Sequence, residues 1–369
     1  MEAEGTRNEL NEQHPMKGGD GLYSYANNFE IQRAASDATK QLINMAIAEK
    51  LDKEILLNSK TFRIADLGCS VGPNTFFAVQ NIVEALESKY KQCQELNSQI
   101  SEFLVLFNDH TTNDFNLLFT SLPQNRPYYA AGVPGSFYDR LFPKASLHFV
   151  HSSIAAILWL SGAPKEVMNK NSPDWNKGRI HYLNSGAQVV RAYKAQFVKD
   201  MEQFLQVRAQ EIVYGGLMVL IISGIPNGTH HSQGLQCMTL DLLGSCLMGL
   251  VRKGIVSEEK VDSFNVPIYE MSPQELEAGV ERNGCFSIET IEYIHHKRLD
   301  NHSHSVMNAK VFASHVRASL ERIIKKHFGE DILDVLFDSF RKKIEENPSI
   351  FKSVKKVNFF VLLKRRAAN

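Results

Sequence analysis

Up to about residue 226, runs of consecutive apolar residues alternate with segments whose apolar residues recur every three or four positions. The runs are typical of strands buried on both faces, and the spaced pattern is typical of helices with one apolar side. The predicted strands are 61–67, 101–110, 145–153 and 215–226, and the predicted helices are 27–50, 74–92 and 196–213. This alternation predicts an α/β fold, with a mostly parallel sheet covered by helices on both faces.

The pattern changes beyond about residue 230. Three segments with helical spacing follow (234–254, 272–284 and 308–329), with one short extended piece near Phe286. The segments 287–299 and 354–366 are expected to close the sheet as an antiparallel pair. We therefore predict a helical cap inserted before the last strands. The expected organisation is a flexible tail (1–15), an α/β domain (16–230 and 331–369) and a mainly helical cap over the active site (231–330).

Composition and charge narrow the class of protein. The 369 residues are 43% hydrophobic, which is ample for a large core, and Lys+Arg and Asp+Glu are balanced at 41 each. This balance predicts neither nucleic acid nor an anionic membrane as a partner. The five cysteines are scattered without a C-x-x-C pair, which favours a reducing compartment. There is no apolar N-terminal signal, and the most apolar stretch, YGGLMVLIISGIP, is shorter than the roughly 20 residues of a membrane span. We expect a cytoplasmic protein.

The segment TFRIADLGCSVGPNTF (61–76) leads a buried strand into Asp66 and then into a turn with Gly68 and Gly72. Ligands of open α/β sheets bind at the edge where the carboxyl ends of the strands meet. Glycine lets the backbone approach a ligand closely, and the helix from about Asn74 directs its N-terminal dipole at the same space. The third glycine of a dinucleotide-binding G-x-G-x-x-G is missing, and there is no G-K-[ST] of a Walker loop.

A second acid, Asp109, ends the next strand, where it is well placed to hold ribose hydroxyls. Asp66 and Asp109 together disfavour a phosphate-rich ligand and favour a cation. A nucleoside that carries a positive centre and no phosphate fits this pattern, and S-adenosylmethionine is such a molecule. The alternative is that Asp66 caps a helix and Asp109 lies in a turn. For each acid alone that alternative is favoured, whereas the pair at successive strand ends favours a pocket.

Three further segments leave two interpretations open. In MKGGDGLYSYANNFEIQR, a loop precedes a helix for which Asn28 is a plausible N-cap. In AAGVPGSFY, Ser136 and Phe137 are suited to lie over a flat adenine, or they belong to a plain turn. Trp159, one of two tryptophans, offers an indole N–H to a carboxylate oxygen, or it is an ordinary core residue. His151 is predicted to be structural, because no nucleophile lies near it in the sequence.

Taken together, several motifs resemble those of the plant SABATH methyltransferases: MKGGDG, SYANN, DLGCSVGPNT, FNDHTTNDFN, GVPGSFY, NKGRIHY and VDSFN. Members of this family methylate small carboxylic acids and, in one branch, xanthine nitrogens. The resemblance covers nearly the whole chain. It implies a Rossmann-like class I methyltransferase sheet with a helical cap, S-adenosylmethionine as the methyl donor, and a homodimer.

The resemblance also assigns roles to residues at matching positions. Contacts to S-adenosylmethionine fall on Tyr25, Cys69, Asn74, Asp109, His110, Ser136 and Phe137. Gln32 and Trp159 match the pair that holds the acceptor carboxylate, and Leu158 is the neighbouring substrate-binding position. A magnesium ion, expected to be structural, is assigned to Asn176, Asp262, Phe264 and Asn265, whose oxygens suit a hard cation.

One segment departs from the family pattern. Relatives read H-S-S-Y-S-L-H-W-L-S or H-S-S-Y-S-L-M-W-L-S, whereas this chain reads HSSIAAILWLS, with one more residue before the tryptophan and Leu158 where His or Met is usual. The change widens the acceptor pocket and removes a polar contact. The favoured function is O-methylation of a small plant carboxylic acid, an iridoid or terpenoid acid such as loganic acid. The alternatives are N-methylation of a xanthine-type heterocycle, an inactive ligand-binding relative, and an NAD-dependent dehydrogenase.

No general base is predicted. A carboxylic acid with a pKa of about 4 is already ionised at neutral pH, so methyl transfer to it needs alignment rather than proton removal. Positioning by Gln32 and Trp159 is the expected contribution of the protein.

Overall fold

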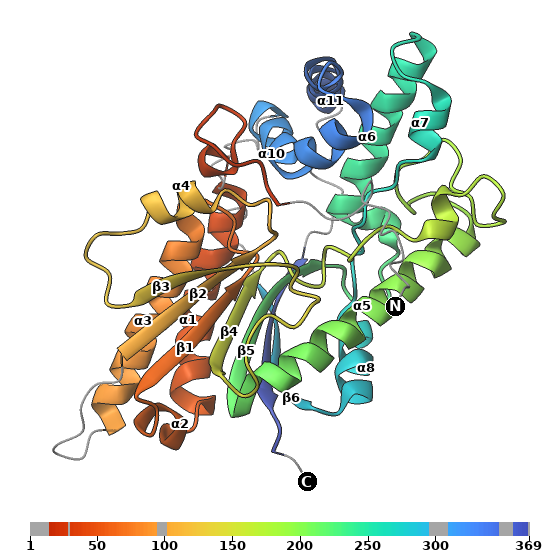
Figure 1. The fold of residues 1–369 in the computed structure, drawn as a ribbon. Helices are drawn as coiled ribbons and strands as arrows, with labels where there is room; N and C mark the ends of the chain where they lie inside the picture. Colours follow the sequence, from red (N-terminus) through yellow and green to blue (C-terminus); the bar gives the residue numbers. More distant parts are fainter. Residues whose placement is uncertain (1–14, 29, 94–101, 295–308, 347–356, 368–369) are drawn as a thin grey trace, which may run out of the picture.

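The computed structural model describes residues 15–28, 30–93, 102–294, 309–346 and 357–367. In this part of the chain, seven strands form a single sheet in the order β3-β2-β1-β4-β5-β7-β6 (Figure 1). The strands are β1 (Thr61–Leu67), β2 (Glu102–Asp109), β3 (Tyr129–Pro134), β4 (Leu147–Ser153), β5 (Ile212–Gly224), β6 (Phe286–Ile294) and β7 (Val357–Arg365). The first five run parallel, and β7 lies antiparallel to both β5 and β6.

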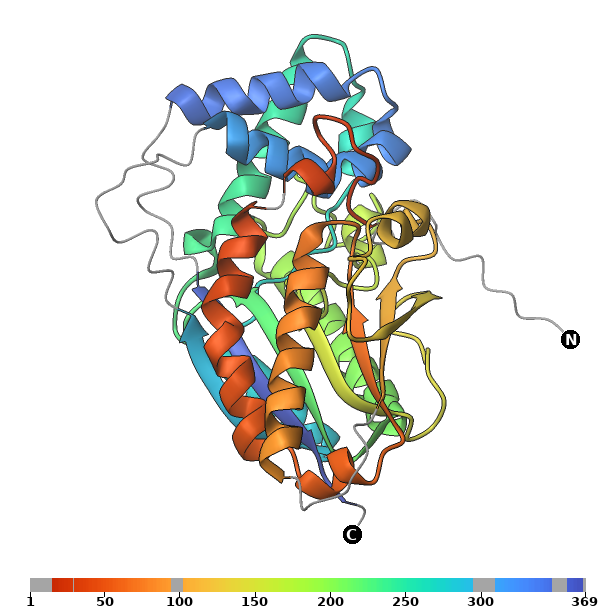
Figure 2. The same cartoon turned by 90° about the vertical axis from the view of Figure 1, so that its left-hand side faces the viewer.

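Helices cover both faces of this sheet. Helices α1 (Glu30–Lys50) and α3 (Pro73–Cys93) pack on one face, and α5 (Ala187–Glu211) and α8 (Pro273–Asn283) pack on the other (Figures 1 and 2). The short helices α2 (Lys53–Leu57) and α4 (Phe115–Thr120) and the 3-10 turns η2 (Tyr25–Asn27), η3 (Lys165–Met168) and η4 (His231–Gln233) lie in the connections. The strands predicted from consecutive apolar residues are therefore confirmed, including the antiparallel pair at the end.

A separate layer of helices stands over one edge of the sheet (Figure 1). It consists of α6 (Leu235–Arg252), α7 (Glu258–Asp262), α10 (Ala309–Phe328) and α11 (Leu333–Glu346), which share one apolar core. The N-terminal segment 15–28 lies against this layer, because the N–H of Lys17 donates to the carbonyl of Ala318 (2.9 Å) and its ammonium pairs with Glu321 (2.6 Å) (Figure 2). The carboxyl ends of β1, β2 and β4 face this cap.

The boundaries of the cap differ from the expected 231–330. Within that range, α8 and β6 belong to the sheet and its covering layer, since α8 packs on α5 and β6. Helix α11, which the predicted boundary assigned to the α/β domain, packs with α6 and α10. Of the predicted tail, 1–14 lie outside the described residues, and Pro15 is buried. Helical spacing alone does not tell which layer a helix joins.

Three other predictions from the sequence can be compared with the structure. The first part of the AAGVPGSFY segment, which is not among the predicted strands, pairs with β2 as the edge strand β3. All five cysteines are free. Among the described residues one helix, α6, is long and apolar enough to cross a membrane, and half of that window is buried inside the protein, where it packs against α11. A core helix of the cap meets the same criteria of length and composition.

Candidate active site

The turn after β1 has a conformation that only glycine adopts without strain. Gly68 has a φ of +77°, and a Cβ at this position would overlap the Cβ of Ala155. The N–H groups of Gly68 and Cys69 both donate to the carbonyl of Asn108, at 2.9 and 3.0 Å. The glycine of DLGCSVG therefore lets the ends of β1, β2 and the loop after β4 come together.

Asp66 does not line the space above this turn. It is 3% exposed, accepts a hydrogen bond from the hydroxyl of Thr75 at the start of α3, and lies 2.7 Å from Nδ1 of His151 on β4. The hypothesis that Asp66 forms a pocket wall is therefore wrong for this structure. Its carboxylate instead joins β1 to α3 and β4, and His151 has the structural position expected for it.

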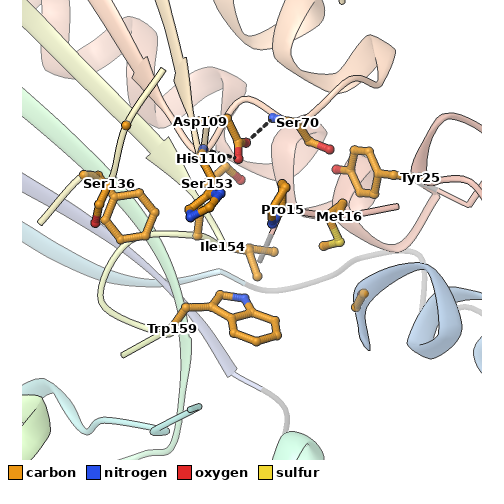
Figure 3. A pocket seen from close by; sticks show the side chains of 15 residues that line it. Pro15, Met16, Tyr25, Ser70, Asp109, His110, Ser136, Ser153, Ile154 and Trp159 are labelled. Carbon is orange, nitrogen blue, oxygen red and sulfur yellow. Dashed lines mark hydrogen bonds between the residues drawn. The ribbon is translucent and has the colours of Figure 1, made fainter. Parts of the chain in front are cut away.

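Asp109, the last residue of β2, lies at the edge of a cavity. Its Oδ2 accepts the N–H of Ser70 (2.8 Å) and its Oδ1 accepts the N–H of His110 (2.7 Å), as Figure 3 shows. Burial raises the pKa of this carboxyl to about 6, although the two backbone hydrogen bonds favour the ionised form. Because a carboxylate has about four acceptor sites, each oxygen retains a lone pair for a ligand.

This first cavity encloses about 660 Å³ of empty space, part of it open to solvent. Its walls are Pro15, Met16, Tyr25, Gly68, Ser70, Asp109, His110, Gly135, Ser136, Phe137, Ser153, Ile154, Ala155, Trp159 and Ser319. In the view of Figure 3, Ser136 and His110 lie on one side and Tyr25 and Met16 on the other. The structure thus brings together six of the predicted site residues, from segments that are far apart in the sequence: Tyr25, Asp109, His110, Ser136, Phe137 and Trp159.

The other predicted donor contacts lie elsewhere. Cys69 is buried in the core between the sheet and α3, where burial raises its pKa well above the usual thiol value, and it does not line the cavity. Asn74 stands behind the wall and donates from Nδ2 to the hydroxyl of Tyr25 (3.4 Å). Gln32 is on the first turn of α1, and its side chain lies outside the described part of the structure. Leu158 lines a second cavity.

The second cavity, of about 680 Å³ partly open to solvent, lies between the loop after β4 and the cap helices α6 and α10. It shares four wall residues with the first cavity: Met16, Ile154, Trp159 and Ser319. Two binding spaces therefore meet at a common boundary, and the indole of Trp159 forms part of it. This arrangement suits a reaction between two ligands that enter separate spaces.

The backbone around Trp159 is held firmly. Its carbonyl accepts the hydroxyl of Tyr138 (2.6 Å), and the residue forms a bridge with Ile268 of the cap. The next residues are also fixed, because Asp200 accepts both the N–H and the hydroxyl of Ser161, at 2.8 and 2.7 Å. No described residue accepts a hydrogen bond from the indole Nε1, which leaves this donor for a ligand.

The loop before Trp159 carries backbone strain. Ile154 and Ile157 have φ values of +54° and +74°, a region that β-branched residues rarely adopt. Such conformations cost roughly 1–2 kcal/mol each and persist only where the surroundings enforce them. The N–H of Ile154 donates to the carbonyl of Ile221 (2.7 Å), the side chain of Ile157 is buried, and the contacts of Trp159 with Tyr138 and Ile268 fix the end of the loop. The unusual HSSIAAILWLS segment is therefore a shaped part of both cavity walls.

The residues assigned to magnesium form a hydrogen-bonded cluster that lines neither cavity. Ser185 donates to Oδ1 of Asn176 (2.6 Å), Nδ2 of Asn176 donates to Oδ1 of Asn265 (2.7 Å), and the N–H of Gly178 donates to Oδ1 of Asp262 (2.6 Å). These hydrogen bonds join the two loops through protein groups, and the assignment of magnesium to Asn176, Asp262, Phe264 and Asn265 stays a prediction.

Removal of divalent cations tests whether a metal ion stabilises these loops. Because hydrogen bonds within the protein already join these loops, EDTA should change the melting temperature by less than about 1 °C, whereas loss of a tightly bound ion would lower it by several degrees. Differential scanning calorimetry with EDTA, and then with excess Mg²⁺, measures this. A decrease that Mg²⁺ reverses would contradict this expectation.

Several wall residues were not predicted as site residues. Met16 is the first residue of the MKGG motif and Pro15 precedes it, and Ile154 and Ala155 belong to the HSSIAAILWLS segment, so the sequence pointed to their regions. Ser319 lies in the middle of α10, and nothing in its helical pattern separates it from a core position. Its place in both walls depends on how the cap is set over the sheet.

Comparisons with known proteins complete the description. A family model for SAM dependent carboxyl methyltransferases matches residues 11–366. The chain is 50% identical over 364 residues to loganic acid O-methyltransferase of Catharanthus roseus, covering 96% of this chain and 95% of the relative. It is 39% identical over 346 residues to caffeine synthase 1 of Camellia crassicolumna, covering 91% and 92%. A solved structure of loganic acid methyltransferase with SAH superposes with a TM-score of 0.91 at 49% identity, covering 96% of this chain and 99% of that one.

Proposed function

Because the chain belongs to the family of S-adenosylmethionine-dependent carboxyl methyltransferases, we propose that it forms the methyl ester of a small plant carboxylic acid of the iridoid or terpenoid class. Membership in the family excludes the dehydrogenase alternative and confirms the class I methyltransferase fold. The observation that carries the proposal is the position of Trp159, whose N–H donates to no described residue and stands at the boundary of the two cavities.

The first cavity suits the methyl donor. No lysine or arginine is among its described wall residues, so it offers no cation for a phosphate. The two remaining lone pairs of Asp109 can accept both hydroxyls of a ribose, and its negative charge favours a positively charged ligand. Phe137 supplies a flat apolar face, and burial raises the pKa of Tyr25 to about 12, so its phenol stays protonated at neutral pH.

The mechanism requires positioning more than proton transfer. When bound, S-adenosylmethionine supplies a methyl carbon on a positively charged sulfur; a carboxylate oxygen forms the new O–C bond while the S–C electrons return to sulfur. Trp159 donates Nε1–H to one carboxylate oxygen and leaves the other to react. Gln32 is the proposed second donor. The contacts of Tyr138 and Asp200 hold the indole loop in place.

The proposal is tested by incubating the protein with methyl-labelled S-adenosylmethionine and a panel of acids, with loganic acid among them. Ester formation, detected by extraction and mass spectrometry, is the expected result. A xanthine mixture serves as the N-methyl acceptor, since a caffeine synthase is also a relative. Methylation of xanthines alone would overturn the proposal, and donor binding without turnover of any acceptor would favour a ligand-binding relative.

The donor affinity is expected to depend on pH through Asp109. Its pKa is raised to about 6 in the free protein, so below that pH a proton occupies the oxygens that the ribose hydroxyls need. Binding then requires release of this proton, and the affinity for S-adenosylhomocysteine should fall by up to about tenfold per pH unit below pH 6 and level off above it. Calorimetric titrations between pH 5 and pH 8 measure this, and Asp109→Asn should remove the dependence. A flat profile for the unaltered protein would contradict the assignment.

A further inference from the structure

The second cavity has few polar groups. Most of its wall is aliphatic or aromatic, with Leu158, Leu240, Ile268, Phe312, Val316 and Leu320 among the residues. No lysine, arginine, aspartate or glutamate is among its described wall residues. A ligand body that enters this space therefore exchanges water for apolar contacts, which favours an apolar skeleton and disfavours several hydroxyls.

Most of the polar side chains in this wall are already bonded to the protein. Thr239 donates its hydroxyl to the carbonyl of Leu235 (2.7 Å), and Ser319 donates to the carbonyl of His315 (3.0 Å), each within its own helix. The ring Nδ1 of His315 lies 3.3 Å from the carbonyl of Asn28. The hydroxyl hydrogens of Thr239 and Ser319 are therefore already used, and their oxygens can act toward a ligand as acceptors only.

Gln236 differs from these polar wall residues in the hydrogen bonds of its side chain. It lies on the first turn of α6 and lines the second cavity but not the first. Its backbone is fixed, because the N–H groups of Gln236 and Cys237 point at the buried carboxylate of Glu270, at 3.4 and 3.2 Å. Its side-chain amide makes no hydrogen bond to any described residue. Among the described wall residues, the indole N–H of Trp159, at the boundary with the donor cavity, and the side-chain amide of Gln236, away from it, donate to no other described residue.

From this arrangement we infer that the acceptor is a small acid with a largely apolar body and a single hydroxyl or carbonyl group remote from the carboxylate, which Gln236 recognises. The inference rests on the proposed function and narrows its substrate class. Glycosylated acids are expected to be poor substrates, because a sugar brings several hydroxyls against a wall that is mostly aliphatic or aromatic. Gln236 is a specificity-determining residue, since it can both donate to and accept from such a group.

The experiment compares three acids that differ in polarity. Geranic acid has an apolar body, its 8-hydroxy derivative adds one remote hydroxyl, and loganic acid carries a glucose. The value of kcat/KM should be about tenfold higher for the hydroxylated acid than for geranic acid, and loganic acid should lie at least about tenfold below the hydroxylated acid. In Gln236→Leu the preference for the hydroxylated acid should disappear.

Thr239→Val is the matched control, since the Thr239 hydroxyl is already bound to Leu235 and its loss should leave the preference unchanged. The affinity of each variant for S-adenosylhomocysteine verifies the fold, because neither residue lines the donor cavity. If loganic acid is the best substrate, or if Gln236→Leu keeps the preference, the inference is overturned while the proposed function stands. If no acid is methylated, the proposed function itself fails.

Discussion

Replacing Trp159 with phenylalanine should lower kcat/KM for the acid about 100-fold, because the change removes the indole N–H and retains an aromatic ring. A hydrogen bond to a charged group contributes about 1.5–3 kcal/mol, and here it also aligns the carboxylate. The affinity for S-adenosylhomocysteine should change by less than about threefold, since the indole forms only one part of the donor cavity wall. Steady-state kinetics with labelled donor and calorimetry with S-adenosylhomocysteine separate the two effects.

Trp175 provides the control for this variant. It is the second tryptophan, lies outside both cavities and contacts the ammonium of Lys177 through its ring. Trp175→Phe should therefore leave the kinetics unchanged. It also leaves Trp159 as the single tryptophan, so that quenching of fluorescence by a bound acid reports directly on that ring. If Trp159→Phe retains full activity, the indole does not hold the carboxylate.

Asp109→Asn should weaken binding of S-adenosylhomocysteine about 50-fold or more. The change preserves the shape of the side chain but replaces one acceptor oxygen with an N–H₂ group, which cannot accept a ribose hydroxyl and also meets a backbone N–H. Loss of a hydrogen bond to a charged acceptor accounts for this magnitude. Calorimetry measures the affinity, and a thermal melt shows how much stability the altered turn loses.

Asp139→Asn removes an equal charge from a nearby exposed position that lines neither ligand cavity, so it controls for the general electrostatic effect. Its affinity for S-adenosylhomocysteine should match that of the unaltered protein. Equal affinities in Asp109→Asn and Asp139→Asn would remove Asp109 from the donor site.

The two acids at strand ends show what local pattern can and cannot predict. Asp66 and Asp109 look alike in the sequence, each at the end of an apolar run. Side chains alternate between the faces of a strand, and Asp66 falls on the face that α3 covers, together with Ile64, whereas Asp109 is the last residue of its strand and lies at the open edge. The sequence placed both acids near the edge, but only the packing of α3 decided which one a ligand can reach.

The helices of the cap show the same difference between what the sequence predicted and what the packing decided. Helical spacing predicted α6, α8 and α10, because an amphipathic pattern is a local property. The spacing did not indicate that α8 packs on the sheet, that α11 completes the cap, or that Ser319 and Met16 lie on the walls of both cavities. Each of these facts depends on which apolar face meets which partner.

The sequence by itself therefore determined six of the seven strands of the described sheet, its mostly parallel direction, the long helices α1, α3, α5, α6, α8 and α10, and the edge at which the cavities lie, since periodicity and the direction of parallel strands suffice for these. The tertiary structure alone decided that Cys69 is buried behind the turn, that the N–H of Trp159 and the amide of Gln236 have no partner among the described residues, and that two cavities meet between the sheet and the cap. These features arise where segments distant in the sequence pack against each other, and such long-range contacts leave no mark in the local pattern of any one segment.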